Sequence, residues 1–513
     1  MDSVRAGARA NGAGGQPPQL PPLPPFAARP VLAPTAVLAG VLTALSGRYG
    51  FHRDELYFLA AGDHPAWGYV DQPPLTPLIA RAATEFFGDS LTGLRVASTL
   101  AYAAIVLVAA AVARELGCGR RAQLLAALGA ALSGQVLAVG QLVATASFDL
   151  LAWLVISLLV LRLLRTGDGR WWLAIGAAVG LGLQNKYLVA LLVLALLPAM
   201  WVTGPRQVLR SRWLPAGAVL ALAVAAPNLW WQAAQGWPQL TVATGISGDD
   251  GAENRLLFVP QQIVYLSPFF VPVWIAGWLR LWRDPALRWA RAFTVAYPLL
   301  CVLVLAVGGK AYYALPPLLV LLAAGCEPVV DWLGRGRRAV RRSAVVAAVA
   351  VTAAVNAVVT LPVLPPSALS FVNEVNREQG EQIGWPELVA TAADGWRRIP
   401  AADRSRAVLV AQNYGEAGAL ARFGPEHGLP EPYSGHMGYA DWGPPPESAN
   451  GPVLLVRQSD APGIDRHFTG CRQVGRVDNG HGLENEEQHA AVLLCSGTSA
   501  PWSALWPELR RFY

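Results

Sequence analysis

Long apolar runs that recur through most of the chain constrain its fold more than any other feature. Runs of about 17 to 21 residues follow one another between residues 31 and 361, and each is long enough to cross the hydrocarbon core of a bilayer as a helix. Only 14% of the 513 residues are charged and 54% are hydrophobic, whereas soluble domains have roughly 25% charged residues. The sequence therefore predicts a mainly α-helical, polytopic membrane protein and not a soluble enzyme.

The apolar runs divide into about eleven expected membrane spans, with an upper limit of about 13. The segments between the first two spans contain two further short amphipathic stretches, which we expect to lie as helices at the membrane surface. The expected spans lie near residues 31–47, 93–113, 121–140, 149–165, 171–185, 187–203, 213–231, 262–281, 289–308, 313–333 and 343–361.

The basic residues predict how these spans are oriented. Connections on one side of the expected spans carry 21 basic residues and those on the other side carry 7. Because cytoplasmic loops are enriched in Lys and Arg, this asymmetry places the N-terminus in the cytoplasm of a multi-pass cell-membrane protein. An odd number of spans then places the C-terminal part of the chain outside the cytoplasm.

Three parts of the chain differ in composition. Residues 1–30, rich in Pro, Gly and Ala, are expected to be a disordered cytoplasmic tail. Residues 31–362 form the expected transmembrane part, and residues 363–513 a small extracytoplasmic α/β domain whose apolar runs 407–411 and 453–456 predict buried strands. Cys471 and Cys495 lie in this last part, and an oxidising exterior would permit a disulfide between them.

Two other functional classes find no support. The net charge of +6 comes from arginines between apolar runs, which form no basic face with interleaved aromatic residues, so no nucleic-acid partner is expected. The five cysteines are scattered and no pair has CxxC spacing, which argues against a zinc ribbon or a redox motif.

The acidic residues expected outside the cytoplasm gather between the first two spans. Asp54 and Glu55 begin an amphipathic stretch that would hold a carboxylate at the boundary between lipid and water. Transfer from a lipid-borne donor to a water-borne acceptor needs a base at such a boundary. The alternative is that Asp54 and Glu55 only cap a helix or pair with Arg53.

Two further acids have the same two interpretations. Asp71 precedes Gln72 and a Pro-Pro turn that starts a second surface helix at about residues 74–87, and Asp149 begins an apolar span. Each would either present a carboxylate to a substrate or act as a helix cap.

Lys186 and Lys310 are both expected on the outer side, against the bias of the other basic residues. Their side chains would either reach lipid headgroups or bind the phosphate of a lipid carrier, where a cation stabilises the charge of a leaving phosphate.

In their order along the chain these motifs resemble glycosyltransferase family 39, GT-C enzymes of the protein O-mannosyltransferase and lipid A aminoarabinose transferase type. The resemblance covers residues 31–362 and implies inverting transfer of a sugar from a polyprenyl-phosphate donor on the extracytoplasmic face. The motifs that carry it are Arg53-Asp54-Glu55-Leu56-Tyr57, Asp71-Gln72-Pro73-Pro74-Leu75, Ser147-Phe148-Asp149, Lys186, and Lys310 through Tyr313-Ala314-Leu315-Pro316.

The resemblance implies a role for each matched position. Asp54 matches the catalytic base, and Glu55 follows it in the catalytic pair. Lys186, Lys310 and Arg53 would bind the donor phosphate. The expected substrate-binding residues are Asp71, Gln72, Asp149, Tyr57 and Tyr313.

One position departs from the aminoarabinose transferases, which have Lys where this chain has Gln72, so that particular activity is in doubt. The sequence establishes no cofactor, and a divalent cation bound by Asp54 and Asp149 stays an open alternative. The C-terminal motifs 413–419, 433–436 and 441–443 resemble the exported tail of bacterial relatives and suit either a sugar platform or an ordinary domain core.

The expected function is therefore that of a membrane glycosyltransferase of the cell envelope. Its expected partners are a polyprenyl-phosphate sugar, membrane lipid, and an acceptor that is a protein, a glycan or a glycolipid. The alternatives are a transporter or flippase for a lipid-linked sugar, in which the same charges line a substrate pathway, and a catalytically silent sugar-binding protein.

Overall fold

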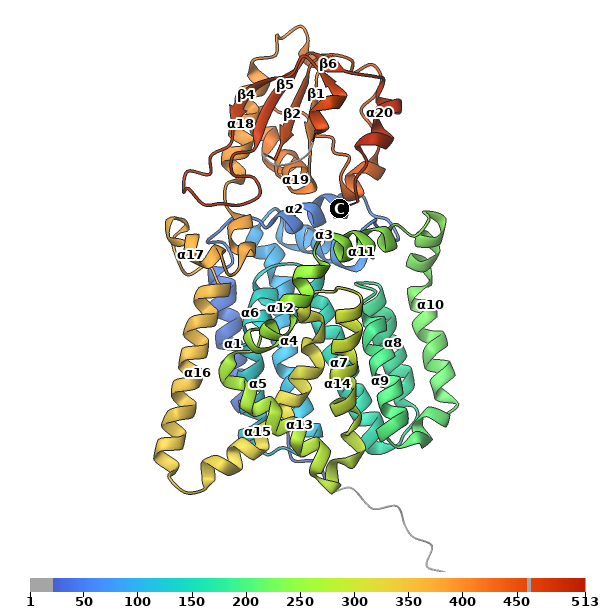
Figure 1. The fold of residues 1–513 in the computed structure, drawn as a ribbon, viewed down its shortest axis with the longest axis vertical. Helices are drawn as coiled ribbons and strands as arrows, with labels where there is room; N and C mark the ends of the chain where they lie inside the picture. Colours follow the sequence, from blue (N-terminus) through green and yellow to red (C-terminus); the bar gives the residue numbers. More distant parts are fainter. Residues whose placement is uncertain (1–21, 459–462, 513) are drawn as a thin grey trace, which may run out of the picture.

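Apolar helices occupy residues 28–360, and a mixed β-sheet with its own helices follows them (Figure 1). The computed structural model describes residues 22–458 and 463–512. The expected mainly helical membrane protein with a small C-terminal α/β part is therefore confirmed. Most of the expected N-terminal tail, residues 1–21, lies outside the described residues, and α1 begins at Ala28, inside the range expected for the tail.

Six helices are long and apolar enough to cross a membrane, and two bent helix pairs raise the number to eight if each pair is one span. The bends are 62° between α5 and α6 and 70° between α12 and α13. The six helices are α1 (Ala28–Leu45), α4 (Leu91–Glu115), α7 (Thr145–Thr166), α10 (Trp213–Ala234), α15 (Leu315–Gly334) and α16 (Arg338–Thr360), and the bent pairs are α5 (Arg120–Ala131) with α6 (Gly134–Gln141) and α12 (Gly251–Val264) with α13 (Val271–Arg283).

The other three expected spans are helical but shorter. They are α8 (Trp171–Leu183), α9 (Val189–Thr203) and α14 (Ala292–Ala306). A helix of 15 residues is about 22 Å long, less than the roughly 30 Å of a bilayer core. Helix length in the described residues thus supports six to eight spans, fewer than the eleven expected.

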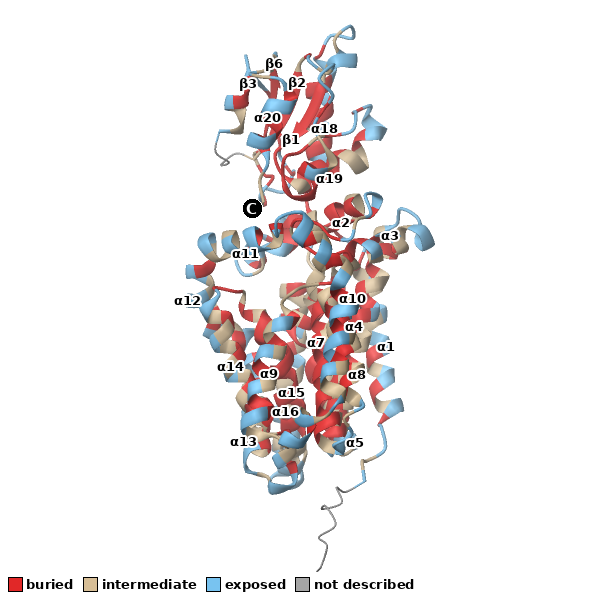
Figure 2. Cartoon of the chain, turned by 90° about the vertical axis from the view of Figure 1, so that its right-hand side faces the viewer, coloured by how far each residue is buried: buried red, intermediate tan, exposed pale blue. Residues whose placement is uncertain are grey.

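The outer helices of the bundle turn apolar side chains away from the protein. Only 17% of the apolar window of α1 and of α16 is buried inside the protein, against 78% for the span that contains α15 (Figure 2). Such exposed apolar surface fits a hydrocarbon environment and would be unfavourable in water. The chain is therefore a multi-pass membrane protein.

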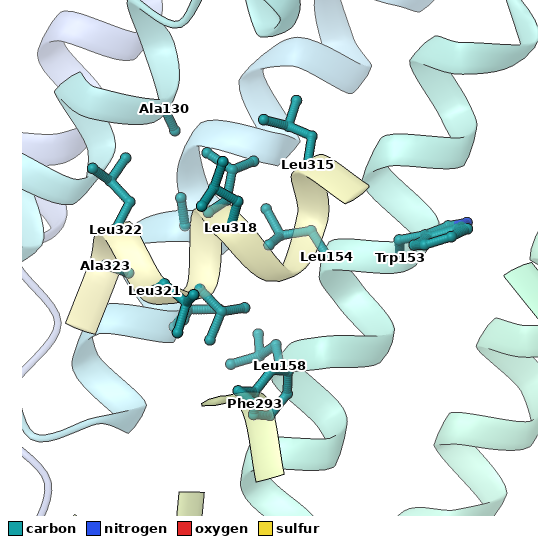
Figure 3. Close-up of a cluster of buried hydrophobic side chains, with 14 of the residues drawn as sticks. Ala130, Trp153, Leu154, Leu158, Phe293, Leu315, Leu318, Leu321, Leu322 and Ala323 are labelled. Atoms are coloured by element: carbon teal, nitrogen blue, oxygen red, sulfur yellow. The ribbon is translucent and has the colours of Figure 1, made fainter. Parts of the chain in front are cut away.

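The centre of the bundle is a continuous apolar core around α15. Leu318 and Leu321 of α15 pack against Leu154 and Leu158 of α7, and Phe293 of α14 closes the cluster from below (Figure 3). These side chains are almost fully buried. This central core holds α7 and α15 in place. α7 carries Asp149, and α15 directly follows the short helix Ala311–Ala314, which carries Tyr312 and Tyr313.

Three helices lie between the bundle and the C-terminal sheet: α2 (Arg53–Asp63), α3 (Leu75–Phe87) and α11 (Pro238–Asp249) (Figure 1). The expected surface helices of the first long connection are thus present as α2 and α3. A second apolar core joins Leu56 and Phe58 of α2 to Leu420 and Leu454 of the C-terminal part. The membrane part and the C-terminal part therefore pack as one unit at this junction.

The C-terminal part contains a four-stranded sheet with strand order β1-β2-β5-β4. β1 and β2 pair in parallel and the other neighbours pair antiparallel, so the expected strands at 407–411 and 453–456 are present. The structure joins Cys471 and Cys495, the candidate pair, in a disulfide between β4 and β5. The elements are α17 (Ser370–Asn373), α18 (Trp385–Arg397), β1 (Val408–Ala411), α19 (Tyr414–Phe423), β2 (Val453–Arg457), β3 (Phe468–Thr469), β4 (Arg472–Arg476), β5 (Ala491–Cys495), β6 (Gly497–Thr498) and α20 (Trp502–Leu509).

Candidate active site

The first residues of α2 lie where the bundle meets the C-terminal part. His52 is the N-cap residue of α2 and forms a capping box with Glu55. The His52 ring accepts a hydrogen bond from the Asp54 amide, and the Glu55 carboxylate accepts one from the His52 amide. α2 then packs between α3 below it and α19 above it. One side of the first turn of α2 therefore faces the bundle, and the other side faces the C-terminal part.

Glu55, expected beside Asp54 in the catalytic pair, is completely buried. Its oxygens accept hydrogen bonds from Arg95 at 2.7 and 2.9 Å, from the His52 amide at 2.9 Å and from the Val143 amide at 3.0 Å. A carboxylate has about four acceptor sites, and these four bonds occupy them. Glu55 therefore has no oxygen left for a substrate, and its expected catalytic role is corrected to a structural one.

Asp54 is the accessible carboxylate of this turn, with 37% of its side chain exposed. Its Oδ1 accepts a hydrogen bond of 2.8 Å from the Tyr414 hydroxyl of α19. The nearest basic atoms, His52 Nδ1 and Arg53 Nε, both lie 4.0 Å from an Asp54 oxygen. Asp54 thus keeps one oxygen open, and its helix-capping alternative is not observed because His52 is the cap.

Asp71 lies in the connection between α2 and α3 and faces α2. Its Oδ1 accepts a hydrogen bond of 2.8 Å from Tyr57, whose hydroxyl also accepts a hydrogen bond from the Gly438 amide. Burial raises the pKa of Asp71 to about 7, although the Tyr57 hydrogen bond opposes this. Pro74 is the N-cap residue of α3, so Asp71 is not a helix cap.

Gln72 is buried beside Asp71, with 2% of the residue exposed. Within the described part of the chain, neither its amide nitrogen nor its amide oxygen has a hydrogen-bond partner. A buried amide without a partner is costly, and a bound hydroxyl would supply one. The position expected to contact substrate thus has unused hydrogen-bonding capacity.

Lys186 lies in the turn between α8 and α9, above two aromatic rings. Its Nζ is 5.2 Å from the ring centre of Tyr313 and 5.9 Å from that of Tyr312. The ammonium also interacts electrostatically with both Asp71 and Asp149. It is therefore near enough to two of the expected substrate-binding carboxylates to interact with both.

Asp149 lies in the second turn of α7, four residues after the first, and accepts a hydrogen bond of 3.0 Å from Trp153 Nε1. The N-cap of α7 is Ala144, so the capping alternative for Asp149 is wrong. Asp149 lines a small pocket whose walls include Trp153, Tyr312 and Tyr313. The structure thus brings Asp149, Lys186 and Tyr313 together.

Two residues expected at the donor phosphate lie apart from this pocket. Arg53 forms an ion pair with Glu486 of the C-terminal part, and its expected phosphate role stays a prediction. Lys310 precedes Tyr312 and Tyr313 and interacts electrostatically with Glu378. Burial opposes ionisation of Glu378, but its hydrogen bond to His52 and the charges of His52, Arg53 and Lys310 lower its pKa to about 2.

The open alternative of a metal bound by Asp54 and Asp149 gains no support. Among the described residues, the group of three carboxylates close enough to share an ion is Glu381, Glu486 and Glu487, in the C-terminal part. Arg53 is bonded to Glu486 of that group. Asp54 and Asp149 each accept a hydrogen bond from a different aromatic side chain, and no third ligand joins them.

Several site residues had no assigned role in the sequence analysis. Tyr414 contacts Asp54 although 360 residues separate them, and Arg95 and Glu378 pair with Glu55 and His52. The motif around Tyr414 was singled out as a sugar platform, but nothing in its composition indicated a contact with α2. Of the site residues, only Lys186 and Tyr313 have sequence positions that predict their proximity, because both lie next to the ends of apolar runs on the same side of the membrane.

Comparison with known proteins supports this fold. Residues 71–231 match the family model "Dolichyl-phosphate-mannose-protein mannosyltransferase", and this segment includes Asp71, Asp149 and Lys186 but not Asp54. A search of curated protein sequences finds no match. The family match confirms the resemblance inferred from the motifs.

Solved structures of similar fold cover nearly the whole chain. The apo structure of ArnT from Cupriavidus metallidurans is 14% identical, with a TM-score of 0.59, and the alignment covers 91% of this chain and 98% of ArnT. The structure of that ArnT bound to undecaprenyl phosphate is 14% identical, with a TM-score of 0.57 and coverage of 90% and 97%. Arabinofuranosyltransferase AftD from Mycobacteria is 14% identical, with a TM-score of 0.50 and coverage of 91% of this chain and 40% of AftD. The chain therefore has an ArnT-like GT-C fold.

Proposed function

On the premise that this chain carries the mannosyltransferase family match on a GT-C fold, we propose that it is an integral membrane glycosyltransferase dependent on a polyprenyl-phosphate sugar. The sugar passes to an acceptor hydroxyl on the extracytoplasmic face. The observation that carries this proposal is a pair of hydrogen bonds of 2.8 Å at one site, from Tyr414 to Asp54 and from Tyr57 to Asp71; the two tyrosine ring centres are 5.1 Å apart. The Lys186 ammonium, over the Tyr313 ring, also interacts electrostatically with Asp71.

The donor phosphate occupies the side of the site formed by Lys186. A structure of similar fold is described as bound to undecaprenyl phosphate, which supports a carrier of this kind here. Lys186 stands over Tyr312 and Tyr313, and no ion pair of Lys186 is present within the described residues. A phosphate would supply this cation with a full negative partner. Lys310, two residues before Tyr312, is the second phosphate-binding residue.

The reaction is a single displacement. Asp54 accepts the proton of the acceptor hydroxyl, whose oxygen forms the bond to the anomeric carbon as the bond to the phosphate oxygen breaks. The electron pair of the broken bond leaves with the polyprenyl phosphate, and Lys186 stabilises the charge that develops there. Attack from the side opposite the leaving group inverts the anomeric carbon. Asp71, Gln72 and Asp149 orient the sugar and the acceptor through hydrogen bonds to hydroxyl groups.

The site is oriented toward the cell exterior and the N-terminus toward the cytoplasm. The asymmetry of 21 basic residues against 7 supports this orientation. The disulfide between Cys471 and Cys495 agrees with it, since such bonds persist in oxidising compartments. Counting each bent pair as one span and including α8, α9 and α14 gives the eleven crossings that bring residues 363–513 to the outer side.

One observation favours a flippase as the second candidate. Transporters bind their substrates at broken helices near the membrane midplane, and the pairs α5–α6 and α12–α13 are bent by 62° and 70°. The charged site, however, lies at one end of the bundle, where α2 and α3 meet the C-terminal part (Figure 1). A transferase needs charges at one membrane surface, whereas a flippase needs a polar pathway that connects both membrane surfaces.

The Asp54→Asn variant tests the proposal. The purified protein in lipid nanodiscs is given a panel of radiolabelled polyprenyl-phosphate sugars, with native membrane extract as the source of acceptors. The variant should lose transfer by about 10²- to 10⁴-fold, because the amide cannot accept the acceptor proton. Asp63→Asn, at the exposed opposite end of α2, is the matched control and should transfer like the wild type.

Label that moves onto an extract component with the wild type and with Asp63→Asn, but not with Asp54→Asn, supports the transferase. Unchanged turnover of Asp54→Asn contradicts the assignment of the base. Saturable donor binding without transfer by any of the three proteins, together with carrier movement across proteoliposomes, would favour the flippase.

A further inference from the structure

The carboxylate of Asp54 is held from the C-terminal part of the chain. The Tyr414 hydroxyl donates a hydrogen bond of 2.8 Å to Asp54 Oδ1. The Tyr414 ring lies among other rings, with its centre 5.1 Å from that of Tyr57 and 5.2 Å from that of His436. These contacts restrict the ring to one position, so the hydroxyl points at one oxygen of Asp54.

Local hydrogen bonds fix the position of Tyr414 at the start of its helix. Tyr414 is the first residue of α19, and Asn413 and Glu416 cap this helix in a reciprocal capping box. Glu416 is completely buried, and its second oxygen accepts hydrogen bonds from the amides of Gln412 and Asn413. The backbone around Tyr414 is therefore held by its own hydrogen bonds before any contact with α2.

Two glycines let α19 approach α2 closely. A Cβ atom on Gly415 would lie 2.9 Å from Arg53 Cβ, and one on Gly418 would lie 2.7 Å from Leu56 Cβ and 3.1 Å from the Leu56 carbonyl carbon. Real Cβ atoms do not come so near to other atoms. The close approach brings the first turns of both helices together, and with them Tyr414 and Asp54.

We propose that Tyr414 is a positioning residue for the catalytic base: its hydroxyl holds Asp54 so that Oδ1 is occupied and Oδ2 receives the acceptor proton. This inference rests on the proposed function, in which Asp54 is the base. Tyr414 keeps its own proton throughout and forms no covalent bond.

The charges around Asp54 agree with these separate roles of its two carboxylate oxygens. Burial, followed by the charge of Asp54, raises the pKa of Tyr414 well above its ordinary value, so Tyr414 stays a donor. The other charged or titratable groups that face Asp54 are His52 and Arg53 beside it and Asp71 in the next connection. The two basic atoms are 4.0 Å away, beyond hydrogen-bonding distance, so Tyr414 makes the direct contact.

The C-terminal part thus completes the active site. Tyr57, which holds Asp71, in turn accepts a hydrogen bond of 3.2 Å from the Gly438 amide of the C-terminal part. Both carboxylates on the acceptor side are therefore oriented by contacts that residues 413–442 supply. A bundle without these residues would retain Lys186 but lose the alignment of Asp54.

Tyr414→Phe in the full-length protein tests the inference, and Tyr439→Phe is its matched control. Tyr439 belongs to the same group of rings and is 5% exposed, but its hydroxyl has no hydrogen-bond partner within the described residues. Tyr414→Phe should lower kcat on the order of 10- to 100-fold, the range expected for a hydrogen bond to a charged group. Its Kd for the polyprenyl-phosphate sugar should stay unchanged, and Tyr439→Phe should change neither quantity.

A double-mutant cycle separates positioning from a general effect on folding. In the Asp54→Asn background, Tyr414→Phe should cause no further loss of the residual transfer, because its effect passes through Asp54. Two results would overturn the inference while the proposed function stands. One is that Tyr414→Phe lowers transfer in the Asp54→Asn background by the same factor as in the wild type. The other is that the Tyr414→Phe enzyme is as active as the Tyr439→Phe enzyme. A wild type that transfers no sugar would overturn both.

Discussion

Asp54 and Glu55 are neighbours in the sequence but have opposite environments. Successive residues of a helix point about 100° apart, so the first turn of α2 sends one carboxylate into the bundle and the other toward the C-terminal part. Glu55 meets Arg95, and both are almost completely buried, whereas Asp54 meets one hydroxyl and solvent. Breaking a buried pair by removing one partner typically costs about 3 to 5 kcal/mol. We expect Glu55 to matter for folding and Asp54 for chemistry.

The two acids are not distinguished by the sequence alone. Both matched the family pattern, and the partners that distinguish them, Arg95 and Tyr414, are 40 and 360 residues away. No local rule of helix capping or charge spacing predicts contacts of that range. Lys186, by contrast, has local surroundings that the sequence does indicate, because it lies in a turn between two apolar helices.

His52 and Glu378 form an ion pair whose contribution to stability depends on pH. Burial lowers the pKa of His52, but the hydrogen bond to Glu378 and the charges of Asp54 and Glu378 outweigh this and raise it overall, with Arg53 opposing. The pair stabilises the fold fully below the ordinary pKa of His, about 6.5, and this stabilisation is lost as pH rises through the higher folded-state pKa. On the acid side it is lost as pH falls below about 4.5 toward the folded-state pKa of Glu378, about 2.

Glu378→Gln should therefore lower Tm more at pH 6 than at pH 9. The Glu378 side chain is 55% exposed, so the effect at pH 6 should be about 1 kcal/mol or less. Thermal unfolding in detergent, followed at both pH values, measures the difference. Glu374→Gln, an exposed acid four residues earlier, is the control. A Tm difference that is the same at both pH values would contradict the linkage.

At the scale of elements, the crossing of α2 and α19 decides whether the site forms. Gly418→Ala would place a methyl group 2.7 Å from Leu56 Cβ, against a helix backbone that cannot move freely. We expect this variant to lose about 1 to 3 kcal/mol of stability and to lose transfer activity while it still binds the donor, because Lys186 lies on another element.

Gly40→Ala in α1 provides the matched control, since a Cβ atom there would have no neighbour within 4 Å. It should leave both stability and transfer near their wild-type values. The measurements are Tm, donor Kd and kcat for each variant. Wild-type kcat in Gly418→Ala would show that the close contact of α2 and α19 is not needed for transfer.

Apolar periodicity predicted the helices better than it predicted their lengths. Every expected span contains a helix, but α8, α9 and α14 have 13, 15 and 15 residues, and two others are divided by bends. Pro198 and Pro298 lie inside α9 and α14, yet both helices continue through them. Hydropathy reports where a segment is apolar and does not report where its backbone turns.

In the molecule as a whole, the proposed active site lies where the helical bundle meets the C-terminal part. The helical bundle supplies Lys186 and Asp149, the connection between α1 and α4 supplies Asp54 and Asp71, and α19 supplies Tyr414. One apolar core crosses the seam and joins α2 to the C-terminal part. Donor lipid and acceptor would therefore meet where membrane helices end and the C-terminal part begins.

The proposed orientation predicts which surfaces are accessible from outside the cell. Glu426→Cys, at an exposed position of the C-terminal part, should react with a membrane-impermeant maleimide in intact cells. Arg337→Cys, exposed at the connection between α15 and α16, should react only after the cells are opened. Labelling of the wild type sets the background: of its three free cysteines, Cys118 and Cys326 are buried and Cys301 is partly exposed. The reverse pattern would contradict the orientation.

The sequence by itself determined that this chain forms a helical membrane body and a small α/β part, and it located the acidic and basic motifs of the GT-C type. Those properties depend on hydrophobicity and on residues close together in the chain, which a linear pattern records. Only the tertiary structure decided that Asp54 is accessible and Glu55 enclosed, that Arg53 is paired with Glu486, and that Tyr414 contacts Asp54. These depend on packing between distant segments, and the free energy of burying or exposing a charge is set by neighbours that the sequence does not place beside it.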